Sequence, residues 1–406
     1  MPLESWLQAR FGGDLELRRY RPEDRRVLAR LGTMAFGESI SKWEEYFDPA
    51  QNPRLDMEQV HVIGEDGEVR AGVTVLPMEV FVDGGPAAMG GVAAVMVHPA
   101  YRRRRYAGDL MRAALGDMRD RGVNLSLLSP FAHVFYRSFG YELATEAVEY
   151  TLKPTDLPTD SGQSNLRAYR EEDLSRMMEL HETEARGHQL GALRSGAYWR
   201  KILGRKDLEA AVYEAELEIR GYLIYKMSSH KEGGEPERHL EVQELVAATL
   251  EARRGLISFL AALDPDSFDI RHWTSREDPL HPYLQSSYVD AKVEPDQMLR
   301  LTDVEGALGH LNRKSGGPLV LEVADDVIPE NAGEYTLGIG GVVRGAEAGE
   351  RVALDVRQLA QLYAGYLPAR QLARHGLLEA SSPAALDLLE EVFPTGDPML
   401  FVPDHF

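Results

Sequence analysis

Residues 95–108 combine an apolar run, a proline, four arginines and small residues in an order suited to binding an anion. The apolar run at 95–97 ends before Pro99, the arginines occupy 102–105, and apolar residues recur at helical spacing over 109–115. This order predicts a strand, a turn and a helix. A helix N-terminus presents unpaired N–H groups and the positive end of a dipole, and arginine adds planar donors that suit phosphate oxygens. The segment therefore predicts a phosphate-binding turn.

The net charge of the chain bears on what this arginine cluster binds. Four arginines could also form a solvated basic face or a patch for nucleic acid. The formal net charge is −20, which repels nucleic acid and anionic membranes and attracts cations. An acidic surface also keeps many proteins in solution. We therefore expect neither nucleic acid nor a membrane as partner, and the charge suits a cationic substrate such as a polyamine or an amino sugar.

Length and composition limit the remaining classes of protein. With 406 residues the chain is too long for one ordinary core, and it predicts two or three domains. It has no cysteine, which excludes disulfides, thiolate metal sites and a covalent acyl-cysteine intermediate. Its 12 histidines follow no metal-binding spacing, so we expect no metal. Since the chain has no membrane-spanning apolar run and no signal-peptide pattern at its start, we expect a cytoplasmic protein.

The elements that must position the arginine turn form an α/β domain. Apolar alternation, helical spacing and turn residues identify them. The predicted strands are 15–20, 60–64, 71–76, 80–82, 91–97, 125–128 and 147–152, and the predicted helices are 22–31, 109–115 and 134–139. The strand at 80–82 is expected to pair with 91–97 across the turn at 83–85. Strands with intervening helices on a mixed sheet make an α/β domain.

A second unit follows a predicted linker. Residues 153–162 are rich in Pro, Ser, Thr and Gly and lack an apolar period, which indicates a linker. The second unit begins again with a strand at 166–169 and a helix at 173–186. Its run at 245–249 is followed by Arg-Arg and a helix at 251–256, which repeats the order of the first unit. We interpret it as a degenerate second copy of the same fold.

A third unit begins near Val293. Its predicted strands are 319–323, 334–337 and 351–355, and its predicted helices are 356–365, 368–375 and 383–393. Strands followed by helices predict an α+β layer structure. The chain ends in the apolar segment 398–406, although chain termini normally fray in water.

The arginine turn resembles the acetyl-CoA motif of the GNAT N-acetyltransferases, in which Arg/Gln-x-x-Gly-x-Gly/Ala follows a Val-x-Val-x-Pro strand. Arg102 and Ala107 match this motif, whereas Arg105 stands where the family usually has glycine. The third unit resembles the sterol-carrier-protein-like domain. This order of three units, with the aromatic segment 135–141, the segment 362–366 and the aromatic C-terminus, resembles the Eis (enhanced intracellular survival) acetyltransferases.

The Eis resemblance implies a domain plan and an assembly. A catalytic GNAT domain is expected at 1–153, a degenerate GNAT-like domain at 163–292, and a sterol-carrier-protein-like domain at 293–406. The resemblance also implies a homohexamer.

The resemblance further implies which residues bind acetyl-CoA. In GNAT proteins the strand that carries Val95, Met96 and Val97 here splays from its neighbour at a bulge, and its freed backbone binds the pantetheine arm. The other coenzyme-binding residues that the family implies are Arg102, Arg103, Arg104, Arg105, Tyr106, Ala107, Gly108, Phe131 and Ala132. Since four arginines cannot all reach one pyrophosphate, Arg103 and Arg104 are expected to bind it.

Tyr136 and Phe406 are the residues that the resemblance implies for proton transfer. GNAT enzymes place a tyrosine near the coenzyme sulfur, and a phenol with a pKa of about 10 can protonate a thiolate whose conjugate acid has a pKa of about 8.5. In the Eis family the C-terminal carboxylate takes a proton from the amine, and a carboxyl with a reference pKa of about 3.3–3.7 is ionised at neutral pH. The alternatives are core packing of Tyr136 between Phe135 and Phe139, and a loose terminus.

Phe36, Glu38 and Trp43 lie where GNAT enzymes form a substrate wall. An aromatic face can hold a cationic amine and Glu38 can pair with it, although ordinary helix packing explains these residues equally well. The predicted protein has two GNAT folds and an α+β sterol-carrier-like domain. It is expected to transfer acetyl directly from acetyl-CoA to an amine of an aminoglycoside, a polyamine-like molecule or lysine. The alternative is a lipid or sterol carrier whose first domain senses acetyl-CoA without turnover.

Overall fold

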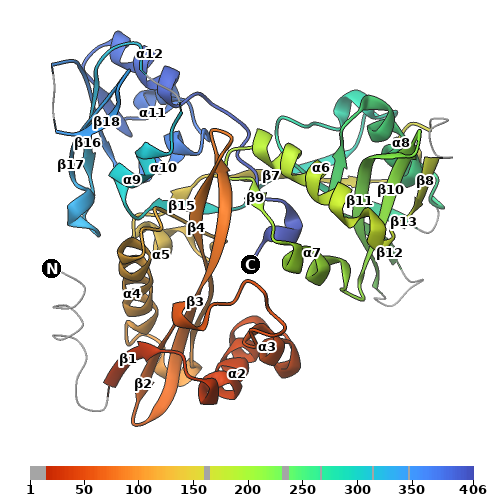
Figure 1. Cartoon of the computed structure of the whole chain (residues 1–406), viewed down its shortest axis with the longest axis horizontal. Coiled ribbons are helices and arrows are strands. Elements are labelled where there is room, and N and C mark those ends of the chain that lie inside the picture. Colours follow the sequence, from red (N-terminus) through yellow and green to blue (C-terminus); the bar gives the residue numbers. More distant parts are fainter. Residues whose placement is uncertain (1–14, 160–164, 231–236, 266–267, 313–314, 346–347) are drawn as a thin grey trace. The chain divides into compact units, whose positions relative to one another are not determined.

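A computed structural model describes most of the chain and divides it into two compact units (Figure 1). The described residues are 15–159, 165–230, 237–265, 268–312, 315–345 and 348–406. The first unit comprises the described residues of Met1–Ala144 and Gln297–Thr395 together with Phe406, and the second comprises those of Thr145–Asp296 and Gly396–His405. The last residues of the predicted linker, 160–162, lie outside the described residues.

A mixed β-sheet forms the centre of the first unit. Its strands run in the order β1 (Leu15–Arg19), β2 (Val60–Glu65), β3 (Glu68–Val82), β4 (Gly85–Val97), β5 (Leu125–Leu128), β15 (Met298–Leu301) and β6 (Glu142–Leu143). β4 and β5 pair in parallel, whereas the other pairs along this path are antiparallel. A parallel pair needs a crossover connection, and the helix α4 (Tyr106–Asp120) supplies it.

Helices cover both faces of this sheet (Figure 1). α4 packs on one face, and α2 (Arg25–Phe36) and α3 (Ile40–Tyr46) belong to the other. Successive side chains of a strand point to opposite faces. Accordingly, Val95 and Val97 pack with the core under α4, whereas Met96 is buried in the core under α2. The arginine turn is therefore attached to a strand that is fixed from both sides.

β3 is longer than the sequence predicts. The prediction ends a strand before 80–82 and pairs 80–82 with 91–97. The structure shows one strand, Glu68–Val82, in which 80–82 pairs with 85–87. The predicted pairing is wrong because β3 continues through Pro77 without a break, and the ladder between β2 and β3 already stops before Pro77. This ladder therefore does not need the N–H that proline lacks.

The second unit repeats the plan of the first sheet. Its strands run in the order β14 (Asp290–Pro295), β7 (Glu146–Leu152), β13 (Phe268–Thr274), β12 (Glu237–Ala247), β11 (Glu218–His230), β10 (Leu208–Ala215) and β8 (Leu166–Ala168). The unit also contains α6 (Leu174–Gly187), β9 (Ala192–Leu193), α7 (Gly196–Leu203) and α8 (Leu250–Ala261). Its one parallel pair, β12–β13, is joined by α8, whose N-cap is Thr249. The predicted degenerate second copy is confirmed.

Two strands near the predicted domain boundaries lie in the sheet of the neighbouring domain rather than in that of the predicted one. β7, predicted as the last strand of the first domain, pairs with β13 and β14 of the second unit. β15 follows the predicted boundary at 292 closely, and it pairs with β5 and β6 of the first sheet. The sheets therefore do not end at 153 and 292. Sequence identifies such runs as strands, but short buried strands share one pattern and do not reveal which sheet takes them.

The rest of the first unit is the predicted α+β layer. Its sheet has the order β18 (Gly341–Arg344), β17 (Gly333–Gly338), β16 (Leu319–Ala324), β19 (Glu350–Asp355) and β20 (Leu378–Ala380). Its helices are α9 (Val304–Gly309), α10 (Val356–Tyr363), α11 (Ala369–Arg374) and α12 (Pro383–Val392). The three predicted strands and three predicted helices are present, and the sequence prediction lacks β18, β20 and α9.

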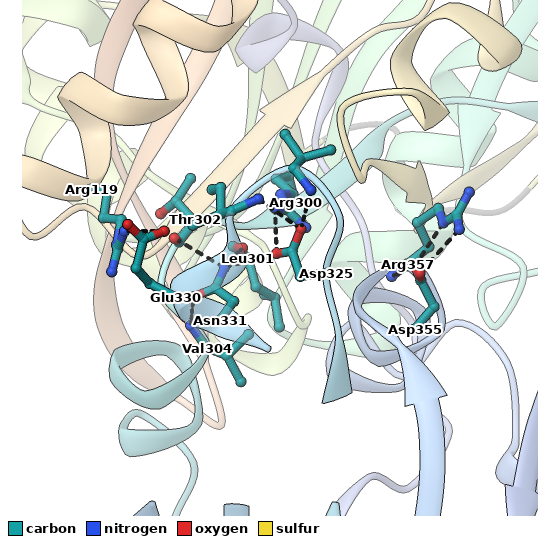
Figure 2. Close-up of polar contacts among 12 residues, drawn as sticks. Arg119, Arg300, Leu301, Thr302, Val304, Asp325, Glu330, Asn331, Asp355 and Arg357 are labelled. Carbon is teal, nitrogen blue, oxygen red and sulfur yellow. Dashed lines mark hydrogen bonds and ion pairs between the residues drawn. The ribbon is translucent and has the colours of Figure 1, made fainter. Parts of the chain in front are cut away.

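A buried ion pair joins β15 to the loop that follows β16 (Figure 2). Arg300 donates from Nη2 to Oδ2 of Asp325 at 2.6 Å, and both side chains are fully buried. Asp325 also accepts from the backbone N–H groups of Val327 and Ile328, each at 3.0 Å, and from Nδ2 of Asn331 at 3.1 Å. This carboxylate therefore fixes the loop of the third domain to the first sheet.

Asp325→Ala should destabilise the first unit strongly, because it leaves the buried guanidinium of Arg300 without its counter-charge. Breaking a buried ion pair from one side typically costs about 3–5 kcal/mol. Chemical denaturation of the two proteins measures the loss. Asp326→Ala is the matched control, since Asp326 is the exposed neighbour and its replacement should change stability by less than about 0.5 kcal/mol. Equal stability of both variants would contradict a structural role for Asp325.

Two kinds of feature are absent from the described residues. None of the described helices is both long and apolar enough to cross a bilayer. Nor does the described part of the chain contain a group of three or more His, Asp or Glu side chains arranged so that they could hold a metal ion.

Candidate active site

β4 separates from β5 in the middle of the first sheet. Their parallel ladder joins only residues 89–91 to residues 125–127. Beyond this point the register between β3 and β4 shifts at a bulge, where Ala94 has a φ of +50°. Residues 95–97 remain in the strand, and Met96 and Val97 pair with β3 on one side. Their other edge offers backbone N–H and C=O groups that an extended ligand can pair with.

The turn after β4 leads into the N-terminus of α4, which begins at Tyr106. Arg103 and Arg105 have φ values of +64° and +71°. This left-handed region costs a non-glycine residue about 1–2 kcal/mol. Arg105 thus adopts a backbone conformation that glycine takes most easily. Glycine is the usual residue at this position of the motif that the turn resembles. Ala107 and Gly108 fall in the first helical turn, where backbone N–H groups lack helical partners and can bind an anion.

The arginine side chains of the turn are all exposed, but they differ in their partners. Arg104 donates from Nη1 to both carboxylate oxygens of Glu65, at 2.9 and 3.1 Å. The side chains of Arg102, Arg103 and Arg105 form no ion pair with any residue that the structure describes. Of the two arginines predicted first for a pyrophosphate, Arg103 is therefore available, whereas Arg104 is held by Glu65.

Tyr136 lies in an aromatic cluster on α5 (His133–Arg137), the helix that follows β5. Its side chain is 3% exposed, and its ring centroid lies 5.0 Å from that of Phe135 and 6.2 Å from that of Tyr141. Burial raises the pKa of the Tyr136 phenol above its ordinary value, so the group is protonated at neutral pH. Its hydroxyl forms no hydrogen bond with another described residue. The phenolic proton thus has no acceptor among the described residues.

Phe131 and Ala132 connect β5 to α5. Phe131 is 71% exposed, and Ala132 is the exposed N-cap residue of α5. Both follow the carboxyl end of β5, just as the arginine turn follows the carboxyl end of β4. In open α/β sheets, ligands bind beyond the carboxyl ends of parallel strands. The two predicted coenzyme-binding segments thus both lie beyond the carboxyl ends of the parallel pair.

The C-terminal residue lies against β4 at the point where β4 leaves β5. A Cβ atom on Gly91 would come within 2.8 Å of the Phe406 ring, so this ring packs directly on the glycine. Gly91 is the last residue of β4 that pairs with β5. The guanidinium carbon of Arg54 lies 6.0 Å from the centroid of the same ring. The structure therefore brings the C-terminus to the splayed strands.

The three predicted substrate-wall residues have different surroundings. Phe36 is 53% exposed, and its ring centroid lies 5.4 Å from that of Trp43. Glu38 is exposed and forms an ion pair with Lys42 at 2.9 Å. Trp43 is partly buried and packs against Phe47, 6.1 Å away, as well as Phe36. Trp43 thus serves helix packing, whereas Phe36 and Glu38 face solvent.

Three buried polar atoms near Trp43 were not predicted from the sequence. Nε1 of Trp43, the hydroxyl of Tyr46 and Oγ1 of Thr74 have no hydrogen-bond partner among the described residues, and the Tyr46 hydroxyl lies close to Thr74 without hydrogen-bond geometry. Burial raises the pKa of Tyr46 to about 12. Buried polar groups are normally paired, so unpaired ones indicate a place for a ligand or water. The helical spacing of Trp43 and Tyr46 could have indicated a shared face, but Thr74 comes from a distant strand.

Comparison with protein families gives a match for each of the three domains. Residues 16–144 match an acetyltransferase (GNAT) domain, residues 191–301 match another acetyltransferase (GNAT) domain, and residues 304–401 match a sterol carrier protein domain. A similar curated protein is an uncharacterized N-acetyltransferase of Streptomyces avermitilis. It is 26% identical over 368 residues, which cover 84% of this chain and 87% of the relative.

Solved structures share the fold of the chain from end to end. A GCN5-related N-acetyltransferase from Anabaena variabilis is similar with a TM-score of 0.85 and 24% identity, covering 97% of this chain and 100% of that one. Eis1 from Mycobacterium abscessus is similar with a TM-score of 0.77 and 23% identity, with the same coverage. With the splayed strands and the arginine turn, these findings identify the chain as a GNAT N-acetyltransferase in which two GNAT domains precede a sterol carrier protein domain.

Proposed function

We propose that the first GNAT domain transfers acetyl directly from acetyl-CoA to a primary amine of a cationic small molecule or of lysine. The observation that carries this proposal is the edge of β4 at residues 95–97, which continues into the N-terminus of α4. GNAT acetyltransferase domains use acetyl-CoA, a molecule with an extended amide-bearing arm joined to a pyrophosphate. A free strand edge followed by an anion-binding helix N-terminus fits these two parts in order.

Each part of the coenzyme has matching groups in the chain. The backbone of residues 95–97 suits the amides of the pantetheine arm. The N–H groups of Ala107 and Gly108 and the guanidinium of Arg103 suit the pyrophosphate oxygens. Phe131 and Ala132 lie beyond the neighbouring strand end, where they can contact the same arm.

The acetyl transfer needs two proton movements. The amine nitrogen forms a bond to the acetyl carbonyl carbon, and the carbon–sulfur bond of the thioester breaks. We propose that the carboxylate of Phe406 takes the proton that the amine loses, directly or through a water. The phenol of Tyr136 gives its proton to the departing thiolate. Because burial keeps this phenol protonated, it suits the role of proton donor. No cysteine exists to carry the acetyl group, which favours a direct transfer.

The acceptor that fits best is a cationic amine such as an aminoglycoside or a polyamine. The formal net charge of −20 attracts cations to the protein surface. The exposed ring of Phe36 offers a cation–π face, and the unpartnered atoms of Tyr46 and Thr74 offer hydrogen bonds to hydroxyl or amine groups. Glu38 can contribute a carboxylate if an acceptor displaces Lys42.

Release of the free thiol from acetyl-CoA tests the proposal. The protein is mixed with acetyl-CoA and separately with kanamycin, spermidine, an arylamine and a lysine peptide. We expect thiol release with kanamycin or spermidine and a product heavier by one acetyl group. Absence of release with all four amines would overturn the proposed activity.

Arg103→Gln should weaken acetyl-CoA binding without unfolding the protein. Each lost charge-assisted hydrogen bond is worth roughly 1.5–3 kcal/mol, which corresponds to about a 10- to 100-fold rise in the dissociation constant. Isothermal titration with acetyl-CoA measures this dissociation constant. Arg104→Gln is the matched control, because Glu65 already holds that guanidinium. The affinity of this variant for acetyl-CoA should change much less. Equal affinities for both variants and the unmodified protein would indicate that the arginines form a solvated face.

The alternative of a lipid carrier rests on the sterol carrier protein match. A hollow in that domain, beside Leu308, Leu337 and Val392, has a volume of about 60 Å³. Pockets for small molecules typically hold about 300–1,000 Å³. This hollow is too small for a sterol, and the match of a fold does not itself imply carriage.

We also propose the homohexamer that the Eis resemblance implies. The mass of the untagged protein measured by light scattering tests it, and a monomer would overturn it.

A further inference from the structure

The two GNAT domains share a local framework that allows residues to be matched between them. In the first domain, Arg18 donates to both oxygens of Asp24 at 2.6 and 2.9 Å just before α2. In the second, Arg167 donates to both oxygens of Asp173 at 2.7 and 2.8 Å just before α6. Because both helices start directly after the aspartate, residue 32 of α2 corresponds to residue 181 of α6.

A second pair of landmarks matches the next helices. Ser39 is the N-cap of α3 and accepts from the backbone of residue 42, and Ser195 is the N-cap of α7 and accepts from the backbone of residue 198. A tryptophan follows each serine by four residues, Trp43 in one domain and Trp199 in the other. Glu38 therefore corresponds to Arg194.

The central hairpins match in the same way. The N–H of His98 donates to the carbonyl of Arg70, and the N–H of Ala248 donates to the carbonyl of Arg220, both at 2.8 Å. Counting from these pairs, Gly72 corresponds to Tyr222. Thr74 pairs with Ala93 and its counterpart Ile224 pairs with Glu244, so Ala93 corresponds to Glu244. The matched sets are Gly32, Glu38, Gly72 and Ala93 in the first domain and His181, Arg194, Tyr222 and Glu244 in the second.

In the second domain these four positions form one buried polar cluster. Arg194 and Glu244 form an ion pair, and their side chains are at most 1% exposed. Nη1 of Arg194 donates to Glu244 Oε1 at 3.1 Å, and the Tyr222 hydroxyl donates to the same carboxylate. The pKa of Glu244 falls to about 2, because Arg194 and His181 outweigh the opposing effect of burial.

The cluster holds one further carboxylate, that of Asp404 near the C-terminus. Arg194 donates to it from Nε and from Nη2, each at 2.7 Å, and the Asp404 side chain is 1% exposed. His181 directs Nδ1 to Glu244 at 3.1 Å and Nε2 to the carbonyl of Ala192 at 3.0 Å. Both carboxylates of the cluster are therefore hydrogen-bonded to Arg194, which makes burial of the set tolerable.

Other contacts bind the tail that carries Asp404. The Tyr198 hydroxyl donates to the carbonyl of Pro403, and the N–H of Met399 donates to the carbonyl of Gln189 at 3.1 Å. The ring centroid of Phe401 lies 5.3 Å from that of His181. The segment is thus held by side chains and backbone of the second domain as far as Asp404, two residues before its end.

We propose that the second GNAT domain is a binding site for the C-terminal segment of its own chain. The four positions that correspond to Gly32, Glu38, Gly72 and Ala93 of its sister domain are rebuilt there as a receptor for Asp404, and Arg194 is a positioning residue for the terminal carboxylate. This rests on the proposed role of Phe406. A terminus normally frays, whereas a base must hold its place, since a displacement of about 1 Å can cost on the order of 100-fold in rate. The receptor supplies that rigidity two residues before the terminus, at Asp404.

Asp404→Asn in the full chain tests the proposal. The change removes one charge, keeps the shape and leaves Arg194 paired with Glu244. We expect the backbone amides of residues 404 and 405 to exchange hydrogen at least 10-fold faster by mass spectrometry. We also expect kcat with acetyl-CoA and spermidine or kanamycin to fall at least 10-fold while the affinity for acetyl-CoA stays unchanged. Asp207→Asn is the matched control, because it removes an exposed pair with Arg205 in the same unit and should change neither quantity.

The outcomes separate this proposal from the proposed activity. Failure of the unmodified protein to release thiol overturns the proposed activity. Hydrogen exchange of the C-terminal amides still tests whether the second domain binds the C-terminal segment. Unchanged exchange in Asp404→Asn overturns the receptor, and a loosened tail with full kcat overturns the positioning role. If Asp404→Asn does not fold, Tyr198→Phe decides, because it removes one hydroxyl bond to Pro403. Faster tail exchange with lower kcat then supports the proposal, and no change in either overturns it.

Discussion

Deletion of Phe406 should nearly abolish turnover while acetyl-CoA still binds. The shortened chain carries its carboxylate on His405, displaced by up to about 3.6 Å of chain. A displacement of about 1 Å can already cost on the order of 100-fold in rate. The deletion also removes the ring that packs on Gly91, so the new terminus loses its contact with β4. Single-turnover kinetics and titration with acetyl-CoA measure the two effects separately.

A set of C-terminal variants separates the carboxylate from the ring. Phe406→Leu keeps a carboxylate at the native position and an apolar side chain, so it should retain much of the activity. A C-terminal extension keeps the Phe406 ring and converts the carboxylate to an amide, so it should be as inactive as the deletion. If the extended and native enzymes turn over equally, the base lies elsewhere. Glu38 would be the next candidate, although its ion pair with Lys42 holds it in the absence of an acceptor.

Local sequence signals predicted most elements because each depends on nearby residues. The strand at 125–128 and the helices around the arginine turn follow from apolar spacing and from capping residues. The pairing of β7 and β15 with strands of the neighbouring domain depends on contacts between distant segments, which no local pattern encodes. The continuation of β3 through Pro77 was not predicted, because the cost of a proline depends on whether a neighbouring strand needs its N–H.

The candidate site divides in the same way. The arginine turn, Tyr136 and the C-terminus could be named from motif order and resemblance. That Arg104 is held by Glu65 could not, because the two lie in different strand–turn segments. The buried cluster around Arg194 was also missed, since Glu244 and Asp404 are far from it in sequence and each alone suggests a surface charge. Chemistry that is assembled from distant residues becomes visible only in the folded chain.

Tyr136→Phe should lower kcat by on the order of 100-fold or more with little change in acetyl-CoA affinity. The substitution keeps the ring in the aromatic cluster and removes only the proton that the thiolate needs. Since burial raises the pKa of the phenol, kcat of the unmodified enzyme should not fall from deprotonation of Tyr136 until the pH exceeds the ordinary phenol value of about 10. Steady-state kinetics across pH and titration with acetyl-CoA measure these effects.

Tyr141→Phe is the matched control for Tyr136→Phe. Tyr141 is also a buried tyrosine of the same segment, but its hydroxyl is bound to Oγ of Ser126 at 2.7 Å. Its loss should cost roughly 0.5–1.5 kcal/mol of stability and leave kcat close to that of the unmodified enzyme. Tyr136→Phe should show the opposite pattern, because its hydroxyl has no partner among the described residues. Near-normal kcat in Tyr136→Phe would show that Tyr136 serves only core packing. The thiolate would then have to take its proton from another group or from water.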